Sequence, residues 1–483
     1  MLHVRPKSGT ASCSGRKVRM RRCCLAGVFL AVWGAAVCAG AQPGDRASTA
    51  VLHFDLRQAI TRALNHNRLL LDSGYGVENR GLSVYASQAA FDLKVKPLST
   101  VGTDDEGKRL TAGLSLSKAF ENGLKTSLAP EFGQVGDEFR GEIAARLEMP
   151  LFRGFGRVTT LDKVDRSRFA FRTARRTYHL ARVKTVLDTV TALYDVVRQK
   201  RLVALLQSRV TGLEHHVQDL RLRQRVGIAG RMDLYRADIQ RQEMLDSLAL
   251  AREGLRNAAD RLKLLLAIPQ RQPIGVSAPL DIDPPDMSPE RAVAVALKRR
   301  TEIRQAEDAL GEARRQALVA RENLLPAVNL VAGYVSSRSS TILGDIFRPE
   351  DARWTVGLSG STEWSRRAEK IAYRQRLNDI QAARLKLQHT REEIRREVRQ
   401  QLDALRRARR RIDIQRAQIH QAEGKRALAA LKFRHNLSDN FDVVDADREL
   451  QRARSSLLHA RIDYIVGVYR LRRALGTLLE DEL

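Results

Sequence analysis

Residues 222–238, LRQRVGIAGRMDLYRAD, interrupt a long polar helical stretch and then restart it. A second copy, LKFRHNLSDNFDVVDAD, stands at residues 431–447. Five aligned positions are identical in the two copies: Leu222/Leu431, Arg225/Arg434, Asp233/Asp442, Ala237/Ala446 and Asp238/Asp447. Each copy has Gly or Asn, then Asp, then renewed helical periodicity, which is typical of a turn between two helices. Internal repeats of this kind predict a chain built from two similar halves.

Unusually long helical stretches flank both turns. Residues 160–225 and 368–436 contain no proline and one glycine each. At about 1.5 Å per residue, each stretch would extend roughly 100 Å as a helix. Because globular helices usually have about 8 to 20 residues, this length predicts a coiled coil or a helical array. With the returning helices after each turn, we expect helical hairpins at residues 160–266 and 366–479.

The pattern changes to that of strands at about residues 92–150. Small, polar and apolar residues alternate there, with turn-forming breaks at residues 104–107 and 121–123. The second half has similar segments at about residues 327–364. Segments of roughly ten alternating residues are typical of membrane barrel strands, although soluble hairpins show the same pattern.

The leading helices extend the duplication. Residues 54–71 have a helical apolar period, and residues 287–303 mirror it, with Ser288 and Pro289 as expected N-cap and first residue. We therefore expect a first repeat at residues 42–268 and a second at 290–483. A proline-rich linker, residues 269–289, separates them.

Residues 1–41 have the pattern of a secretory signal peptide. Basic residues precede an apolar run at 23–37, and Ala39-Gly40-Ala41 follows as a cleavage site. All four cysteines, Cys13, Cys23, Cys24 and Cys38, lie within this segment. We expect cleavage after Ala41 and a mature chain without thiols; lipid acylation of Cys38 is the alternative.

The net charge of +28 raises nucleic acid as a candidate partner, but export makes this class improbable. The arginine-rich stretch at 391–411 also contains Glu392, Glu393, Glu397 and Asp403, as a solvated helix face does. No catalytic triad or paired-carboxylate motif stands out, and His215-His216 lacks a carboxylate at zinc-motif spacing. We expect no enzymatic activity, no cofactor, no metal and no nucleic acid.

An ordered set of motifs carries a resemblance to a known family. The motifs are Ala59-Ile60 with Ala63-Leu64, residues 149–157 (MPLFRGFGR), Val226-Gly227-Ile228 with Asp233, Leu324-Leu325-Pro326, and Asp442. Over about residues 52–480 the chain resembles the TolC-type outer membrane efflux proteins. The resemblance implies a mainly α fold with a β-barrel part. Duplicated long helical hairpins would form a coiled-coil tunnel, and four transmembrane strands per chain would build one twelve-stranded barrel in a homotrimer.

The same resemblance implies a passive export duct in the outer membrane of a Gram-negative bacterium, with a large periplasmic part. Its partners would be outer membrane lipid, a periplasmic adaptor and an inner-membrane transporter of RND, ABC or MFS type, in tripartite efflux or type I secretion. A periplasmic coiled-coil structural or adaptor protein without a barrel is the first alternative. A secreted basic polyanion-binding protein is the second.

The resemblance also assigns roles to residues of the turns. Asp442 and Asp445, with Asp233, would form the channel gate, because three-fold symmetry turns two carboxylates per chain into a ring of six. The simpler interpretation is that these aspartates only cap or begin helices. Candidates to pair with the gate are Arg231, Arg236 and Arg434. The expected adaptor-docking tip comprises Val226, Gly227, Ile228, Asn436 and Leu437.

The chain departs from the family pattern at several places. Asn436 stands where the first turn has Gly227, and Glu363-Trp364-Ser365 replaces the usual Pro-Leu pair. The first half has four strand-like segments where the family has two. We therefore expect an additional hairpin near Leu110 to Phe132.

Overall fold

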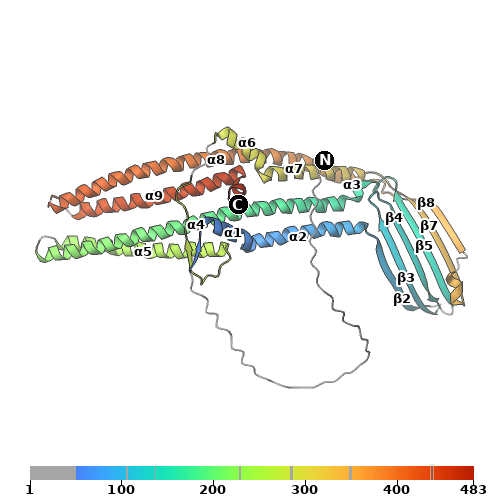
Figure 1. Ribbon diagram of the computed structural model, residues 1–483. Helices are drawn as coiled ribbons and strands as arrows, with labels where there is room; N and C mark the ends of the chain where they lie inside the picture. The colour runs from blue at the N-terminus through green and yellow to red at the C-terminus, as the bar shows by residue number, and fades with distance from the viewer. Residues whose placement is uncertain are drawn as a thin grey trace, which may run out of the picture. The chain divides into compact units, whose positions relative to one another are not determined.

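Two long helical hairpins dominate the structure, a computed structural model (Figure 1). It describes residues 51–104, 107–135, 138–227, 230–282, 287–347, 351–435, 437–438 and 440–482. Helices α4 (Asp162–Arg225) and α5 (Arg231–Leu265) form the first hairpin, and α8 (Arg367–Arg434) and α9 (Asn440–Leu475) form the second. The predicted class, mainly α with duplicated long hairpins, is confirmed. Within the described residues, no helix combines the length and apolarity needed to cross a membrane.

Shorter helices precede each hairpin in the same order. Ser288 caps the second leading helix as expected: its side chain accepts a hydrogen bond from the backbone N–H of Arg291 at 3.3 Å, and Pro289 follows at the first helical position. In the first half, Asp55 accepts from the N–H of Gln58 at 2.7 Å. The remaining helices are α1 (Leu56–His66), α2 (Arg68–Gln88), α3 (Arg157–Thr160), α6 (Pro289–Arg299), α7 (Thr301–Glu322) and α10 (Leu478–Glu482), with 3-10 turns η1 (Ala89–Phe91) and η2 (Leu343–Phe347).

The joint between α1 and α2 is tied to the end of the returning helix α5. Asn67 is buried at this joint and begins α2 by accepting a hydrogen bond from the N–H of Leu70 at 3.1 Å. Its Nδ2 donates to the carbonyl oxygen of Leu265 at 3.0 Å. One neutral side chain therefore satisfies backbone groups at two helix ends, which otherwise lack partners.

The joint between α6 and α7 has the same arrangement with different chemistry. Arg300 is buried there and donates Nη1 to the carbonyl oxygen of Ala474, at the end of α9, at 3.3 Å. Its guanidinium also pairs with Glu302 at 2.8 Å and with Glu397 of α8 at 3.0 Å. A charged network therefore holds the second joint, where an amide holds the first.

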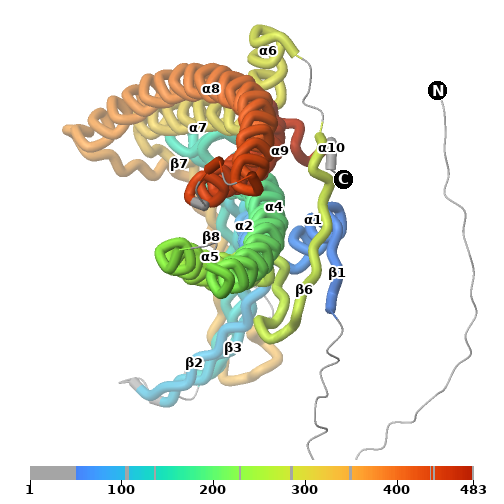
Figure 2. Tube along the Cα trace, turned by 90° about the vertical axis from the view of Figure 1, so that its left-hand side faces the viewer, coloured from blue at the N-terminus to red at the C-terminus, as the bar shows by residue number. Residues whose placement is uncertain are grey.

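Apolar cores lie where the leading helices pack on the hairpins. Tyr194 of α4 is fully buried in the first core, near Tyr469 of α9, and its hydroxyl donates to the carbonyl oxygen of Pro279 at 3.0 Å. This bond fixes part of the proline-rich segment on α4. Nearby, β1 (Leu52–Phe54) pairs in parallel with β6 (Ile274–Val276), as Figure 2 shows. The second core joins α6, α8 and α9.

One antiparallel sheet takes strands from both halves of the chain. Its strand order is β2-β3-β4-β5-β7-β8, so the last strand of the first half pairs with the first strand of the second half. The strands are β2 (Lys94–Asp104), β3 (Gly107–Ala119), β4 (Lys125–Val135), β5 (Glu138–Pro150), β7 (Ala327–Ser340) and β8 (Asp351–Ser361).

The described residues thus give six strands in this sheet, two more than the four that the resemblance implies. The additional pair is the hairpin expected near Leu110 to Phe132, which the structure forms from β3 and β4. Its strands pair with β2 on one side and with β5 on the other. The hairpin is therefore part of the sheet, because its backbone groups complete the hydrogen bonding of both neighbours.

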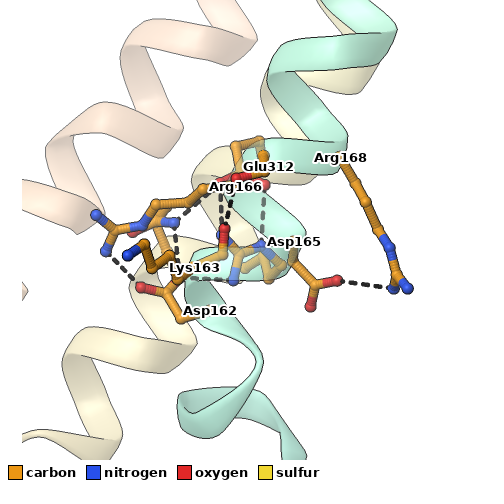
Figure 3. Close-up of polar contacts among 9 residues, drawn as sticks. Asp162, Lys163, Asp165, Arg166, Arg168 and Glu312 are labelled. Carbon is orange, nitrogen blue, oxygen red and sulfur yellow. Dashed lines mark hydrogen bonds and ion pairs between the residues drawn. The ribbon is translucent and has the colours of Figure 1, made fainter. Parts of the chain in front are cut away.

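Where α4 begins, a polar network ties it to α7 (Figure 3). Asp162, the first residue of α4, accepts from Arg315 of α7 at 2.8 Å and pairs with Arg166 at 2.6 Å. Arg315 also pairs with Glu312 at 2.6 Å. Hydrogen bonds to Glu312 and Asp162 raise the pKa of Arg315 above its ordinary value. A carboxylate in the first turn is favourable for α4 in addition, because it faces the positive end of the helix dipole.

We expect Arg300→Met to lower the thermal unfolding temperature of the detergent-solubilised protein. Methionine keeps the length of the side chain, but Glu302 and Glu397 lose their cation. Leaving a fully buried charge without its partner costs about 3–5 kcal/mol, and the cost is smaller here because Glu302 and Glu397 are 30% and 33% exposed. Circular dichroism melting measures the change, and the exposed Arg314→Met on α7 is the control. Equal melting temperatures for the two variants would contradict the role of this joint.

Candidate functional site

The first turn, between α4 and α5, is shaped by two glycines. Gly227 follows the end of α4 with φ of +77°, a left-handed conformation that glycine adopts without strain. Gly230 then precedes α5, and its N–H donates to Oδ2 of Asp233 at 3.3 Å. Asp233 therefore closes the start of its own helix. This contact accounts for an Asp at this position without reference to a channel.

The second turn, between α8 and α9, repeats this use of an aspartate. The N–H of Leu437 donates to the carbonyl oxygen of Lys432 at 2.9 Å, which closes the end of α8. Ser438 then donates its hydroxyl to Oδ2 of Asp442 in the first turn of α9. Asp233 and Asp442 are thus equivalent in sequence and similar in local structure.

Asp445 faces the partner helix of its hairpin. Lys425 of α8 donates Nζ to Asp445 at 2.9 Å and to Glu449 at 2.7 Å. The hydrogen bonds to Glu449 and Asp445 raise the pKa of Lys425 above its ordinary value. Lys425 is therefore a cation that pairs with Asp445 within the chain. The gate role of Asp442, Asp445 and Asp233 stays a prediction, as does their pairing with Arg231, Arg236 or Arg434, which are exposed near the turns.

Asp447, two residues further along α9, connects three helices. It forms an ion pair with Arg209 of α4 and a second with Arg426 of α8, the latter at 2.9 Å. The Arg209 side chain is only 7% exposed. Burial lowers the pKa of Arg209 to about 10, and the positive charges of Arg426 and Arg448 add to this shift. Arg209 is still charged at neutral pH, so it needs the carboxylate of Asp447.

Among the described residues, the equivalent aspartate of the first half forms its ion pair and hydrogen bonds within its own helix. Asp238 accepts from Arg241 at 2.9 Å and from Gln242 at 3.3 Å, all on α5. A second ion pair also joins the two helical hairpins: Arg448 of α9 pairs with Glu243 of α5 at 3.2 Å. Two residues that are identical in the repeated motif thus have different roles.

The sequence showed Asp447 as a repeated residue but gave no sign of its partner. Arg209 lies far from it in the chain, in a helix with many arginines. Closer to the turns, the guanidinium of Arg223 lies 5.2 Å from the ring centre of Phe433, and Phe433 packs against the apolar cluster of Val217, Leu220 and Ala237. Contacts between the hairpins therefore continue toward the turns.

The turns themselves expose apolar side chains. Val226 is 68% exposed and Leu437 is 77% exposed, and their role in adaptor docking stays a prediction. Ile228 and Asn436, the other members of the expected tip besides Gly227, lie outside the described residues. Sequence reasoning missed further exposed apolar residues beside them: Met232, Tyr235 and Phe441. The alignment of Met232 with Phe441 in the repeated motif was the signal that could have identified them.

Comparison with known proteins shows which proteins the chain is similar to. Residues 292–477 match the family model "Outer membrane efflux protein". The outer membrane efflux protein BepC of Brucella suis is 24% identical over 71% of this chain and 74% of its own length. The probable efflux pump outer membrane protein TtgC of Pseudomonas putida is 23% identical over 87% of this chain and 82% of its own.

The fold is also that of solved outer membrane proteins. The structure of the outer membrane protein VceC of Vibrio cholerae covers 87% of this chain and 96% of its own, with a TM-score of 0.67 at 16% identity. The outer-membrane channel OprN covers 87% and 90%, with a TM-score of 0.67 at 18% identity. The chain is therefore similar to outer membrane efflux proteins of Gram-negative bacteria over most of its length, residues 292–477 match the model of that family, and the chain has the fold of the solved outer membrane channels.

Proposed function

We propose that this chain is the outer membrane duct of a tripartite efflux or type I secretion system. Three copies form one passive channel, which docks to a periplasmic adaptor and to an inner-membrane transporter of RND, ABC or MFS type. The sheet forms the membrane part, the hairpins form the periplasmic tunnel, and the turns form its inner end. The two-sided character of the sheet is the observation that carries this proposal.

The two faces of the sheet differ in polarity across all strands. Residues paired across antiparallel strands share a face, and successive residues alternate between faces. One row of paired residues has one member on each strand, and each member has an apolar or aromatic side chain: Val95, Leu116, Leu128, Ala145, Tyr334 and Trp354. The hydroxyl of Tyr334 is the polar exception. The adjacent row lies on the opposite face and is polar at every position except Gly333, which has no side chain: Lys94, Ser117, Ser127, Arg146, Gly333 and Thr355.

The apolar face, defined by the first of these rows, is exposed in the single chain. Trp354 is 77% exposed, and Val95 and Leu128 are also exposed. Soluble proteins rarely leave an apolar surface of this kind open to water. Alternation of an apolar outer face with a polar inner face is the pattern of a membrane barrel. Outer membrane lipid is therefore the partner that suits the apolar face.

We expect the protein to occur as heat-modifiable trimers in outer membrane fractions. A high-salt wash should not release them, because burial of apolar surface in lipid does not depend on charge screening. Electrophoresis of heated and unheated fractions measures this. Purely soluble periplasmic protein would instead favour a coiled-coil adaptor without a barrel. Polyanion binding that weakens steeply with salt would favour the basic binding protein.

At the turns, we propose that Asp442 and Asp445 form a carboxylate ring around the inner opening. Two such groups per chain become six around a three-fold axis, and charged rings of this kind select or hold cations. Asp233 contributes from the first turn. The pairing of Lys425 with Asp445, and the pairing of Asp447 with Arg209, support a closed arrangement in which the second turn is held in place.

The double variant Asp442→Ala, Asp445→Ala should raise single-channel conductance in planar bilayers and weaken block by trivalent cations. The physical reason is the loss of six negative charges from the constriction. The control is Glu253→Ala, which removes an exposed carboxylate of α5 far along the helix from the turn. Unchanged conductance together with unchanged cation block would remove Asp442 and Asp445 from the gate.

Asp447→Asn should also raise conductance, because it separates the hairpins instead of changing charge at the opening. The variant leaves Arg209 buried and unpaired, at a cost of about 3–5 kcal/mol to the closed arrangement. Asp238→Asn is the matched control, since the same residue in the first repeat pairs only within α5. Planar-bilayer recordings compare the two. Equal conductance in both variants would show that the Arg209 pair does not hold the closed state.

A further inference from the structure

The described sheet ends in two open edges, the strands β2 and β8. In the described sheet, β2 and β8 each have a paired strand on one side only. All residues of β8 are exposed, as are residues 94–103 of β2. Each edge presents unpaired backbone N–H and C=O groups. Within hydrocarbon such groups cost several kcal/mol each, so a membrane sheet must close on itself.

The additional hairpin has the same two faces as its neighbours. On β3, Leu116 lies on the apolar face between Val95 and Leu128, and on β4 Leu128 pairs with Ala145 of β5. On the polar face, Ser117 pairs with Ser127. Strands β3 and β4 have 13 and 11 residues, and a tilted membrane strand needs about 9–11. Polarity and length therefore suit β3 and β4 to the membrane as well as the other strands.

The turn of this hairpin is built into the junction between β5 and α3. Glu121 pairs with Arg157 at 2.9 Å, and the carbonyl oxygen of Asn122 accepts from the N–H of Gly156 at 3.0 Å. Gly123 has φ of +100°, and a Cβ there would lie 2.6 Å from the carbonyl oxygen of Gly154. The turn therefore packs closely on the loop that leads from the sheet to the first hairpin. A hairpin that did not belong to the sheet would not need to pack so closely on this loop.

Strand directions permit closure between copies. Neighbouring strands alternate in direction across the sheet, and an even number of strands makes β2 and β8 run in opposite directions. The edge of one copy thus meets the edge of the next in the antiparallel manner of every other pair in this sheet. Both edge strands have 11 residues, so their lengths match.

We propose that three copies close through β2 and β8 into one barrel of eighteen strands, six from each chain. This proposal rests on the trimeric duct proposed above and changes its dimensions. Barrel diameter grows roughly in proportion to strand number, so the barrel is about 1.5 times as wide as a twelve-stranded one. Barrels of 16–18 strands enclose an aqueous channel. The membrane part is therefore wide open, and passage is limited at the helical turns.

Cysteine pairs across the seam test the proposal in the full chain. All four native cysteines lie at or before residue 38, so the sheet contains none. Thr355→Cys on β8 is combined in turn with Lys96→Cys, Leu98→Cys or Thr100→Cys on β2. All four positions belong to the polar face by their strand register. The matched controls combine Thr355→Cys with Ser127→Cys or Ala129→Cys on β4, which is the edge strand if only β4, β5, β7 and β8 form the barrel.

We expect covalent dimers and trimers under oxidation for at least one β2–β8 pair and none for the β4–β8 pairs. Crosslinks through β4, or intact outer membrane trimers without any crosslink, would overturn the eighteen-stranded barrel. The same gels, run without oxidant, report the trimer itself. Absence of trimers from the outer membrane would instead refute the proposed duct and this inference with it. Electron cryomicroscopy of the unmodified trimer gives a second measurement, with eighteen strands expected in cross-section and twelve as the contrary result.

Discussion

Twelve residues of β5 pair with twelve of β7, from Phe139 with Ser340 to Pro150 with Asn329, and this ladder joins the two halves of the chain. The pairing continues past the strands, where the N–H of Leu151 donates to the carbonyl oxygen of Val328 at 2.8 Å. It therefore determines which helices leave the sheet side by side. The ion pair between Asp162 of α4 and Arg315 of α7 lies just beyond it and depends on this register. A slip of one residue would also exchange the two faces of the sheet.

The two halves of the chain share the same order of helices and strands, but the polar contacts at equivalent positions differ. Asp238 and Asp447 occupy the same place in the repeated motif, yet within the part of the chain that the structure describes Asp447 pairs with the opposite hairpin and Asp238 pairs within α5. Asn67 and Arg300 hold equivalent joints with an amide and with an ion network. In both places the second half holds the contact that depends on charge. Such contacts can be broken by protonation, salt or a competing partner, so the second hairpin is the better candidate for the moving part.

Much of this fold could be predicted from local patterns. The absence of proline over residues 160–225 and 368–436 indicated the long helices, the repeated motif indicated their turns, and Ser288 with Pro289 indicated the start of α6. The additional hairpin followed from alternation and from a glycine-containing turn. The link from Arg209 to Asp447 could not be predicted, because helix periodicity does not say which of many arginines faces a distant carboxylate. The gate and the docking tip need a trimer, and one chain cannot define either.

The position of the additional hairpin has a consequence for how such channels evolve. The strand β2 enters the sheet from α2, and β5 leaves it toward α3 and α4. If a single strand were inserted between β2 and β5, the chain would leave the sheet on the cell-surface side. The first helical hairpin, α4 and α5, would then lie outside the cell. Insertion of a hairpin returns the chain to the side it left. The number of barrel strands can therefore change only in steps of two per chain. In a trimer, one β-hairpin gained by the gene adds six strands to the barrel.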